Sequence, residues 1–194
     1  MLLRGDSKEI RYYQGKKLSS INDFRENSIK GPQKVDIKKY RLEISGEVNN
    51  PVSLSYEETL ADFKPVKKVV RMHCVEGWEL DLLWEGLKLK DILSRAGVKP
   101  EAKIVIFHST DGYSTSIELD YVYKHDLLLA YKINGLILPP ERGFPFQLAA
   151  EGKWGYKWAK WVQKIELSKS VSFRGYWEER GYNSKGNISE PIFE

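Results

Sequence analysis

The residues best suited to chemistry in this chain are its single cysteine, Cys74, and its three histidines. A lone cysteine that follows a valine-rich segment is by default a small buried apolar side chain. A structural zinc site usually draws on several cysteines, and the chain has one. The adjacent His73 is a poor base for this thiol, because neighbouring side chains of a strand point to opposite faces.

Two functional interpretations of Cys74 remain open at this point. The thiol could be a nucleophile activated by His108 or His125, if the fold brought one of them close. It could instead be the protein ligand of a metal whose other ligands come from a cofactor. Molybdenum on a pterin dithiolene is a group of this kind, and the soft sulfur suits it.

A series of short motifs runs along the chain around and after Cys74. They are HCVEGW at 73–78, WEGL at 84–87, FHSTDGY at 107–113, LAYKING at 129–135, LPP at 138–140, RGFPFQ at 142–147, GYKWAKW at 155–161 and FRGYWEERGY at 173–182. Their order and spacing resemble those of the sulfite-oxidase-like molybdopterin-dependent oxidoreductases of the compact prokaryotic type, over roughly residues 40–185. Each motif alone is weak, but the ordered series is specific.

This resemblance implies a fold and a cofactor. The expected fold class is α+β, with mixed β-sheets and short helices as in the molybdopterin domain of sulfite oxidases. The expected cofactor is molybdenum with molybdopterin, with the Cys74 thiolate as the metal ligand and His73 in contact with the cofactor. The resemblance assigns Lys160 to the cofactor phosphate, with Arg142 and Lys157 nearby.

The phosphate end departs from the family pattern at two positions. The family commonly has Arg where this chain has Gln147, and often His where it has Arg142. The positive charge has therefore moved from one position to the other, and the group that meets the phosphate is open.

Asn27 and Asp111 are two further candidates for contact with the pterin. Asn27 ends a segment, residues 24–27, that loosely resembles an Arg-Asn-His segment of the family; an Asn at a helix end is the simpler interpretation. Asp111 begins an Asp-Gly turn, and a hairpin explains it without any ligand.

The C-terminal motif supplies the candidates for the substrate side. Tyr182 is in register with the tyrosine that sulfite oxidases place beside the metal, where a phenol can donate a hydrogen bond. Packing on Trp177 is its structural alternative. Arg180 would add positive charge for an oxyanion, and simple exposure at the surface is its alternative.

The activity that the resemblance implies is oxygen-atom transfer at molybdenum. Sulfite oxidation and the reduction of sulfoxides or N-oxides are both compatible with it, so the expected substrate is a small oxyanion or an S- or N-oxide. The chain has no C-x-x-C-H haem motif. Electrons are therefore expected to pass to or from a separate partner protein.

Two other classes of protein compete with this interpretation. One is a Cys-dependent thiol enzyme. The other is a non-catalytic, basic, Trp-rich module that binds nucleic acid or anionic lipid through four lysines at helical spacing, Lys153, Lys157, Lys160 and Lys164. Gly152 and Gly155 favour a loop that leads into a strand over a helix in this region.

The elements that must position these residues follow from hydrophobic periodicity and turn signals. Strands are expected at residues 40–45, 66–74, 103–108, 113–117, 127–133, 136–138, 146–150 and 160–167. Helices are expected at residues 20–26, 55–63, 87–96 and 119–124. The order shows no regular βαβ alternation and no glycine-rich phosphate loop, which argues against Rossmann and P-loop enzymes.

Composition describes an ordinary globular protein. The chain has 194 residues, 41% of them hydrophobic, and a net charge of +4 that does not require a nucleic-acid partner. We expect an N-terminal arm, residues 1–39, packed on one catalytic domain, residues 40–194. The absence of a long apolar run, of an export signal and of a cysteine pair predicts a cytoplasmic protein with no membrane span.

Overall fold

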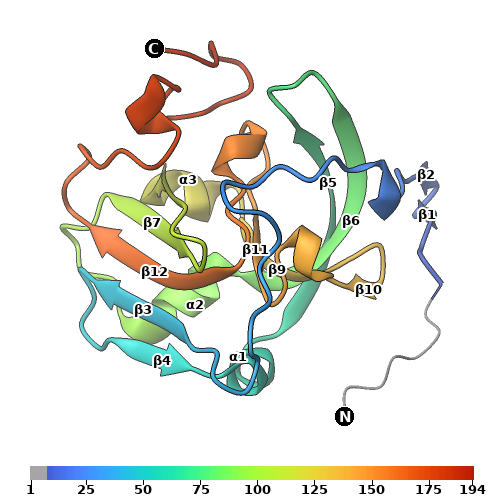
Figure 1. Cartoon of the computed structure of the whole chain (residues 1–194). Coiled ribbons are helices and arrows are strands. Elements are labelled where there is room, and N and C mark those ends of the chain that lie inside the picture. The colour runs from blue at the N-terminus through green and yellow to red at the C-terminus, as the bar shows by residue number, and fades with distance from the viewer. Residues whose placement is uncertain (1–7) are drawn as a thin grey trace.

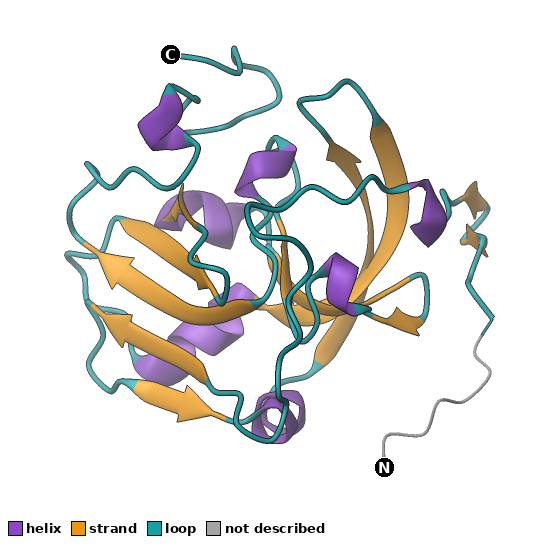
Figure 2. Ribbon diagram, in the orientation of Figure 1, coloured by secondary structure: helices purple, strands orange, loops and turns teal. Residues whose placement is uncertain are grey.

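Two five-stranded sheets form the body of the protein in the computed structural model, which describes residues 8–194 (Figure 1). The strand order is β10-β9-β6-β5 in the first sheet, where β11 also pairs with β9, and β4-β3-β12-β7-β8 in the second. Figure 2 shows that strands dominate and helices are short. The predicted α+β class with mixed sheets is confirmed.

The first sheet is built on a long antiparallel hairpin. Its two strands, β5 (Pro65–His73) and β6 (Glu79–Lys88), pair from Pro65↔Leu87 to His73↔Glu79. The other strands of this sheet are β9 (Leu128–Ile133), β10 (Leu136–Ile137) and β11 (Gln147–Ala149). The hairpin stands on the right in Figure 1, and the loop at its tip contains Cys74.

The second sheet places the last strand of the chain at its centre. β12 (Val162–Ser168) runs parallel to β3 (Leu42–Gly46) and antiparallel to β7 (Ile104–Ser109). The edge strands are β4 (Val52–Leu54) and β8 (Ser114–Glu118). The loop before β12 therefore enters the middle of the sheet, which fixes its position from both sides.

The helices begin and end at the residues that the sequence signals mark. α1 (Tyr56–Asp62) starts with a capping box between Ser55 and Glu58. α2 (Leu89–Ala96) buries its apolar stripe and ends at Gly97, which is left-handed. α3 is Leu119–Lys124, and 3-10 turns occur at η1 (Ile21–Asp23), η2 (Pro140–Arg142), η3 (Gly155–Lys157) and η4 (Glu178–Arg180).

One continuous apolar core joins the two sheets. Trp84 of the first sheet and Phe107 of the second are both fully buried members of it. Phe146 leads into β11 and packs against Tyr40 and Tyr56, with ring centroids 6.0 and 5.3 Å away. The loops at the ends of both sheets are thus anchored to the same packed core.

Several sequence expectations differ from the structure, and the strands at residues 12–13, 16–17 and 52–54 were not expected. No strand was expected at residues 79–86, because β6 is buried on much of both faces and shows no clean alternation. The helix expected from residue 87 starts at Leu89, since Leu87 and Lys88 still pair with β9. The helix expected at residues 20–26 is only the 3-10 turn η1, capped by Ser20. The loop expected around Gly152 and Gly155 is confirmed, with η3 as a helical turn, and the strand expected from residue 160 begins at Val162.

The N-terminal segment crosses the middle of the view in Figure 1, from the small hairpin of β1 (Tyr12–Tyr13) and β2 (Lys16–Lys17) to β3. Residues 1–7 of the predicted arm lie outside the described residues. The division into an arm and a catalytic domain stays a prediction. Within residues 8–194, no helix has the length and apolar character needed to cross a membrane.

Gly86 lies where β6 bulges against β9, and a Cβ there would meet the carbonyl oxygen of Leu129 at 2.6 Å and Cα of Ala130 at 2.7 Å. Gly86→Ala should therefore lower the free energy of unfolding by about 2 kcal/mol, measured by urea denaturation. Gly155→Ala is the control, because Gly155 is outside the positive-φ region and its Cβ would meet no atom closer than 3.2 Å, so it should lose much less. Equal losses in the two variants would contradict this role of Gly86.

Candidate functional site

Cys74 lies in a tight turn at the tip of the β5–β6 hairpin. Its amide donates to the Trp78 carbonyl at 2.9 Å, and its carbonyl accepts from the Gly77 amide at 3.1 Å. Gly77 has φ +85°, a conformation that glycine adopts without strain. The sequence CVEGW thus closes the hairpin and fixes the cysteine at a defined point.

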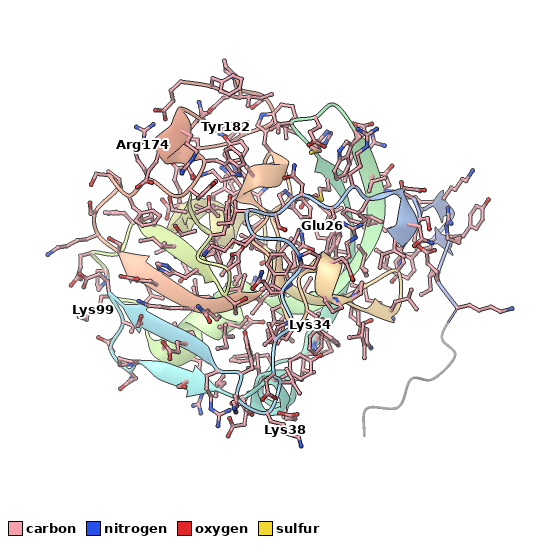
Figure 3. All side chains as sticks on the ribbon, viewed as in Figure 1. Glu26, Lys34, Lys38, Lys99, Arg174 and Tyr182 are labelled. Carbon is pink, nitrogen blue, oxygen red and sulfur yellow. The ribbon has the colours of Figure 1, made fainter. Side chains whose placement is uncertain are left out.

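The thiol side of this turn forms part of the wall of a cavity of about 300 Å3. The other walls come from residues 24–29 of the N-terminal segment, the turn at 109–113, the loop at 142–161, and two aromatic residues near the C-terminus, Trp177 and Tyr182. Segments far apart in the sequence therefore meet around Cys74. Figure 3 labels Glu26 of the N-terminal segment and Tyr182 of the C-terminal segment.

Cys74 is buried, with 6% of its surface exposed. Burial raises the pKa of its thiol. None of the three histidines lines the cavity. His108 pairs with Glu166 at 3.0 Å, and His125 stacks on Tyr121. A depressed thiol pKa and a neighbouring base, which a thiol nucleophile needs, are both missing from this arrangement within residues 8–194.

Arg142 and Lys160 supply positive charge on the wall of the cavity. Burial lowers the pKa of both side chains. Arg142 donates to the carbonyls of Phe24 at 3.1 Å and Arg25 at 3.4 Å, and its guanidinium lies 4.4 Å above the Phe24 ring. Lys160 pairs with Glu26 at 2.9 Å.

Gly143 allows Arg142 and Lys160 to share this wall. It has φ +89°, and a Cβ there would lie 3.1 Å from the Cβ of Lys160 and from that of Gln147. Only a residue without a side chain leaves room for the irregular segment that carries Lys160 just before β12. The motif RGFPFQ thus positions the lysine that follows it by more than a dozen residues.

The cavity wall carries buried polar atoms that have no partner in the described part of the chain. Among residues 8–194, the buried Ser109 hydroxyl and Gln147 carbonyl oxygen make no hydrogen bond, and both residues line the cavity. An unpaired buried polar group costs about 1–3 kcal/mol. Asp111 is also buried on this wall, and it accepts a hydrogen bond from the Tyr113 amide at 2.9 Å. The cavity is therefore prepared for a polar occupant.

Tyr182 and Trp177 form the aromatic side of the cavity. Their ring centroids lie 5.1 Å apart, and the Tyr182 ring also meets Tyr156 edge-on at 5.0 Å. Tyr182 thus packs on Trp177 and also lines the cavity. The two interpretations offered by the sequence do not exclude each other.

Three of the predicted site residues do not line the cavity. His73 precedes the turn and pairs with Glu79 at 3.2 Å. Arg180 is exposed, and its guanidinium lies over the Tyr176 ring at 3.7 Å. Lys157 has no exposed surface and pairs with Glu178. The structure does bring together Cys74, Asn27, Asp111, Arg142, Lys160 and Tyr182.

Lys157 fastens the C-terminal segment to the second sheet. Its ammonium donates to the Ser116 carbonyl at 3.0 Å, the Ser184 carbonyl at 2.6 Å and the Glu178 carboxylate. Burial lowers its pKa, and the Glu178 charge opposes that shift. Lys153 is equally buried and donates to Asn187 at 2.6 Å. These lysines therefore hold the segment that carries Trp177 and Tyr182.

Sequence reasoning missed several groups at the site. Glu26 contacts Lys160 across 134 positions of sequence, and no local pattern marks such a pair. Ser109 lies inside the recognised motif at 107–113, but only its burial without a partner distinguishes it. Trp177 was named only as a packing partner for Tyr182, and the HCVEGW motif marked Trp78 without assigning it a role. Both rings line the cavity.

Lys157→Met should destabilise the protein by about 3–5 kcal/mol, because it leaves the Glu178 charge buried without a partner. Urea denaturation measures the loss. The double variant Lys157→Met with Glu178→Leu removes both charges and should recover most of it. A single variant within about 1 kcal/mol of the wild type would show that the pair contributes little.

Comparison with known proteins identifies related sequences. The family described as "Oxidoreductase molybdopterin binding domain" matches residues 29–177. The Bacillus subtilis protein named "Uncharacterized oxidoreductase YuiH" is 38% identical over 157 residues, which cover 80% of this chain and 78% of that protein. The protein-methionine-sulfoxide reductase catalytic subunit MsrP of Campylobacter jejuni is 30% identical over 183 residues, which cover 82% and 61%.

A solved structure has the same fold. The sulfane dehydrogenase SoxCD from Paracoccus pantotrophus matches with a TM-score of 0.68 and 26% identity, over 72% of this chain and 41% of that one. The chain spans less than two thirds of both the MsrP and the SoxCD chains. The match confirms that the two sheets and their loops have the architecture of a molybdopterin domain.

Proposed function

The chain belongs to the family of oxidoreductases with a molybdopterin-binding domain, and from this premise we propose that the Cys74 thiolate binds the metal of the molybdenum cofactor inside the cavity. The protein is a molybdenum-dependent oxidoreductase, and its cofactor is molybdenum with molybdopterin. The observation that carries the proposal is the geometry: Cys74 and the cations Arg142 and Lys160 line one cavity.

The residues present fit such a cofactor. A buried thiol is a soft ligand, which becomes a thiolate when it binds a metal. Arg142 and Lys160 offer charge-assisted donors for a phosphate. The unpartnered Ser109 and Gln147 oxygens offer hydrogen bonds to the polar atoms of a pterin. Lys160 is the proposed phosphate ligand, and Arg142 supports it. Gln147 is uncharged where the family commonly has Arg, so it would contribute a hydrogen bond and no charge.

The proposed reaction is oxygen-atom transfer at a sulfur centre. When bound, the cofactor supplies the redox chemistry of that transfer. The relatives MsrP and SoxCD, named as a methionine-sulfoxide reductase and a sulfane dehydrogenase, support sulfur over nitrogen as the reacting atom and leave both directions open. The expected substrate is a small molecule or an exposed side chain that carries an S–O group or accepts one.

The chain's own residues have separate roles in this proposal. Cys74 fixes the metal end, and Lys160 fixes the phosphate end. Tyr182 is the proposed hydrogen-bond donor to the substrate oxygen, because a phenol can donate without carrying charge. The Trp177 ring beside it excludes water from that side. Asn27 and Asp111 are proposed pterin contacts, whereas the contacts of His73, Arg180 and Lys157 favour support of the surrounding elements.

The competing classes have less support. The thiol enzyme lacks a histidine at the cavity and has a raised thiol pKa. The basic binding module needs an exposed row of lysines. Lys153 and Lys157 are fully buried, Lys160 lines the cavity, and Lys164 pairs with Glu166 at 2.8 Å. We also propose that a separate protein exchanges electrons with this one and that the protein is cytoplasmic.

Cys74→Ser should retain less than about a tenth of the molybdenum of the wild type when both are expressed in molybdenum-replete cells, because a hydroxyl replaces the soft thiolate. Elemental analysis of the purified proteins measures it, with pterin content recorded in parallel. Wild-type protein that contains neither molybdenum nor pterin would overturn the proposed function. Equal molybdenum in the two proteins would remove Cys74 from the metal.

Lys160→Ala should lower pterin retention by about tenfold, the effect of losing one charge-assisted contact to a phosphate. Lys164→Ala is the matched control, since Lys164 is on the same segment but does not line the cavity. Pterin content after dialysis, measured by fluorescence of the oxidised pterin, separates them. Equal retention in the two variants would contradict the assignment of the phosphate to Lys160.

A further inference from the structure

The N-terminal segment at residues 24–29 is a wall of the cavity that is held in place by polar contacts. Glu26 pairs with Lys160 at 2.9 Å, and Asn27 donates to Glu76 at 3.1 Å. Arg142 donates to the Phe24 carbonyl at 3.1 Å. Two of these three contacts use the cations that the proposed function gives to the cofactor phosphate.

The charges around Lys160 are already balanced. The groups that act most strongly on its ammonium are Glu26, Arg142 and Asp111. Together with Lys160 these groups are two cations and two carboxylates, and Arg25 and Glu76 add one charge of each sign to the cavity wall, so the local charges balance. A phosphate monoester near neutral pH carries about −1.5 to −2. Adding it with both carboxylates in place would leave a mostly buried wall strongly negative, which is unfavourable at low dielectric.

One of the two carboxylates is free to leave. Asp111 is 4% exposed and accepts a hydrogen bond from the Tyr113 amide within its turn, so moving its carboxylate would break that contact. Glu26 lies on the N-terminal segment, 31% of its side chain is exposed, and it does not itself line the cavity. Its only direct ion pair within residues 8–194 is the one to Lys160.

We propose that the Glu26 carboxylate is a stand-in for the cofactor phosphate: it neutralises Lys160 in the cofactor-free protein and is released when the phosphate takes its place. The inference rests on the proposed function, in which Lys160 binds the phosphate. Release of Glu26 removes one of the contacts that hold residues 24–29 against the site. Residues 24–29 thereby act as a latch: they are held closed by Glu26 when no phosphate is bound to Lys160 and loosen when it is bound.

If Glu26 and phosphate compete for Lys160, removing the Glu26 charge should strengthen phosphate binding. Glu26→Gln removes the competing charge, so cofactor-free protein should bind inorganic phosphate about fivefold more tightly than the wild type does. Titration calorimetry measures the affinity, and pterin content after dialysis should rise in parallel. In the wild type, phosphate should also speed amide hydrogen exchange in residues 20–30. That acceleration should be absent in Glu26→Gln, where exchange is already fast.

Glu9→Gln is the control, because it should loosen the N-terminal segment without changing the charge beside Lys160. Glu9 accepts from the Ile21 amide at 2.6 Å and from Asn134 at 2.9 Å, and it does not line the cavity. It should leave phosphate affinity unchanged. Thermal unfolding confirms that each variant is folded.

The outcomes separate this inference from the proposed function. Weaker or unchanged phosphate binding in Glu26→Gln, together with loss of binding in Lys160→Ala, would overturn the stand-in role and retain Lys160 as the phosphate ligand. An equal gain in Glu9→Gln would show that loosening, and not charge, is the cause. Unchanged phosphate binding and pterin content in Lys160→Ala would overturn the phosphate assignment and the latch with it.

Discussion

The buried ion pair between Lys157 and Glu178 determines how the cavity is enclosed. Removing two charges from water is expensive, and further hydrogen bonds offset part of that cost, although the Glu178 Oε2 atom makes none within residues 8–194. Here Thr115 donates to Glu178 at 2.6 Å, and the Lys157 ammonium reaches carbonyls of the sheet and of the C-terminal segment. Because these directional contacts have one arrangement, the segment that carries Trp177 and Tyr182 has one position over the cavity.

This constraint explains why Lys157 and Lys160, three residues apart in one motif, differ in role. η3 ends at Lys157 and the chain from there to Lys160 is irregular, so Lys157 contacts the second sheet and Lys160 lines the cavity. One lysine fixes the aromatic wall, and the other offers charge to the occupant. The Cys74 turn meets the same loop, where a Cβ on Gly155 would lie 3.5 Å from the Cα of Cys74. Support and binding therefore share a single short segment.

Much of the fold was predictable because local signals agree with the tertiary structure. The capping box at Ser55, the Asp111-Gly112 turn and the apolar stripe that ends at Gly97 each mark an element that forms. β6 was not predicted, since burial on both faces removes the alternation by which a strand is recognised. The motif series includes five segments that line the cavity and three that do not. It could not predict which way Lys157 points, because loop conformation and not spacing sets that direction.

The pairing of Glu26 with Lys160 shows the limit of sequence reasoning most clearly. Both residues are charged, both lie in segments without regular structure, and only the folded chain brings them together. A cation placed on a cavity wall to meet an anion is costly when the anion is absent, because burial disfavours its charge. A carboxylate on a peripheral segment relieves that cost without occupying the cavity. Binding of the cofactor phosphate and closure of residues 24–29 are then coupled, because the phosphate and the Glu26 carboxylate compete for Lys160.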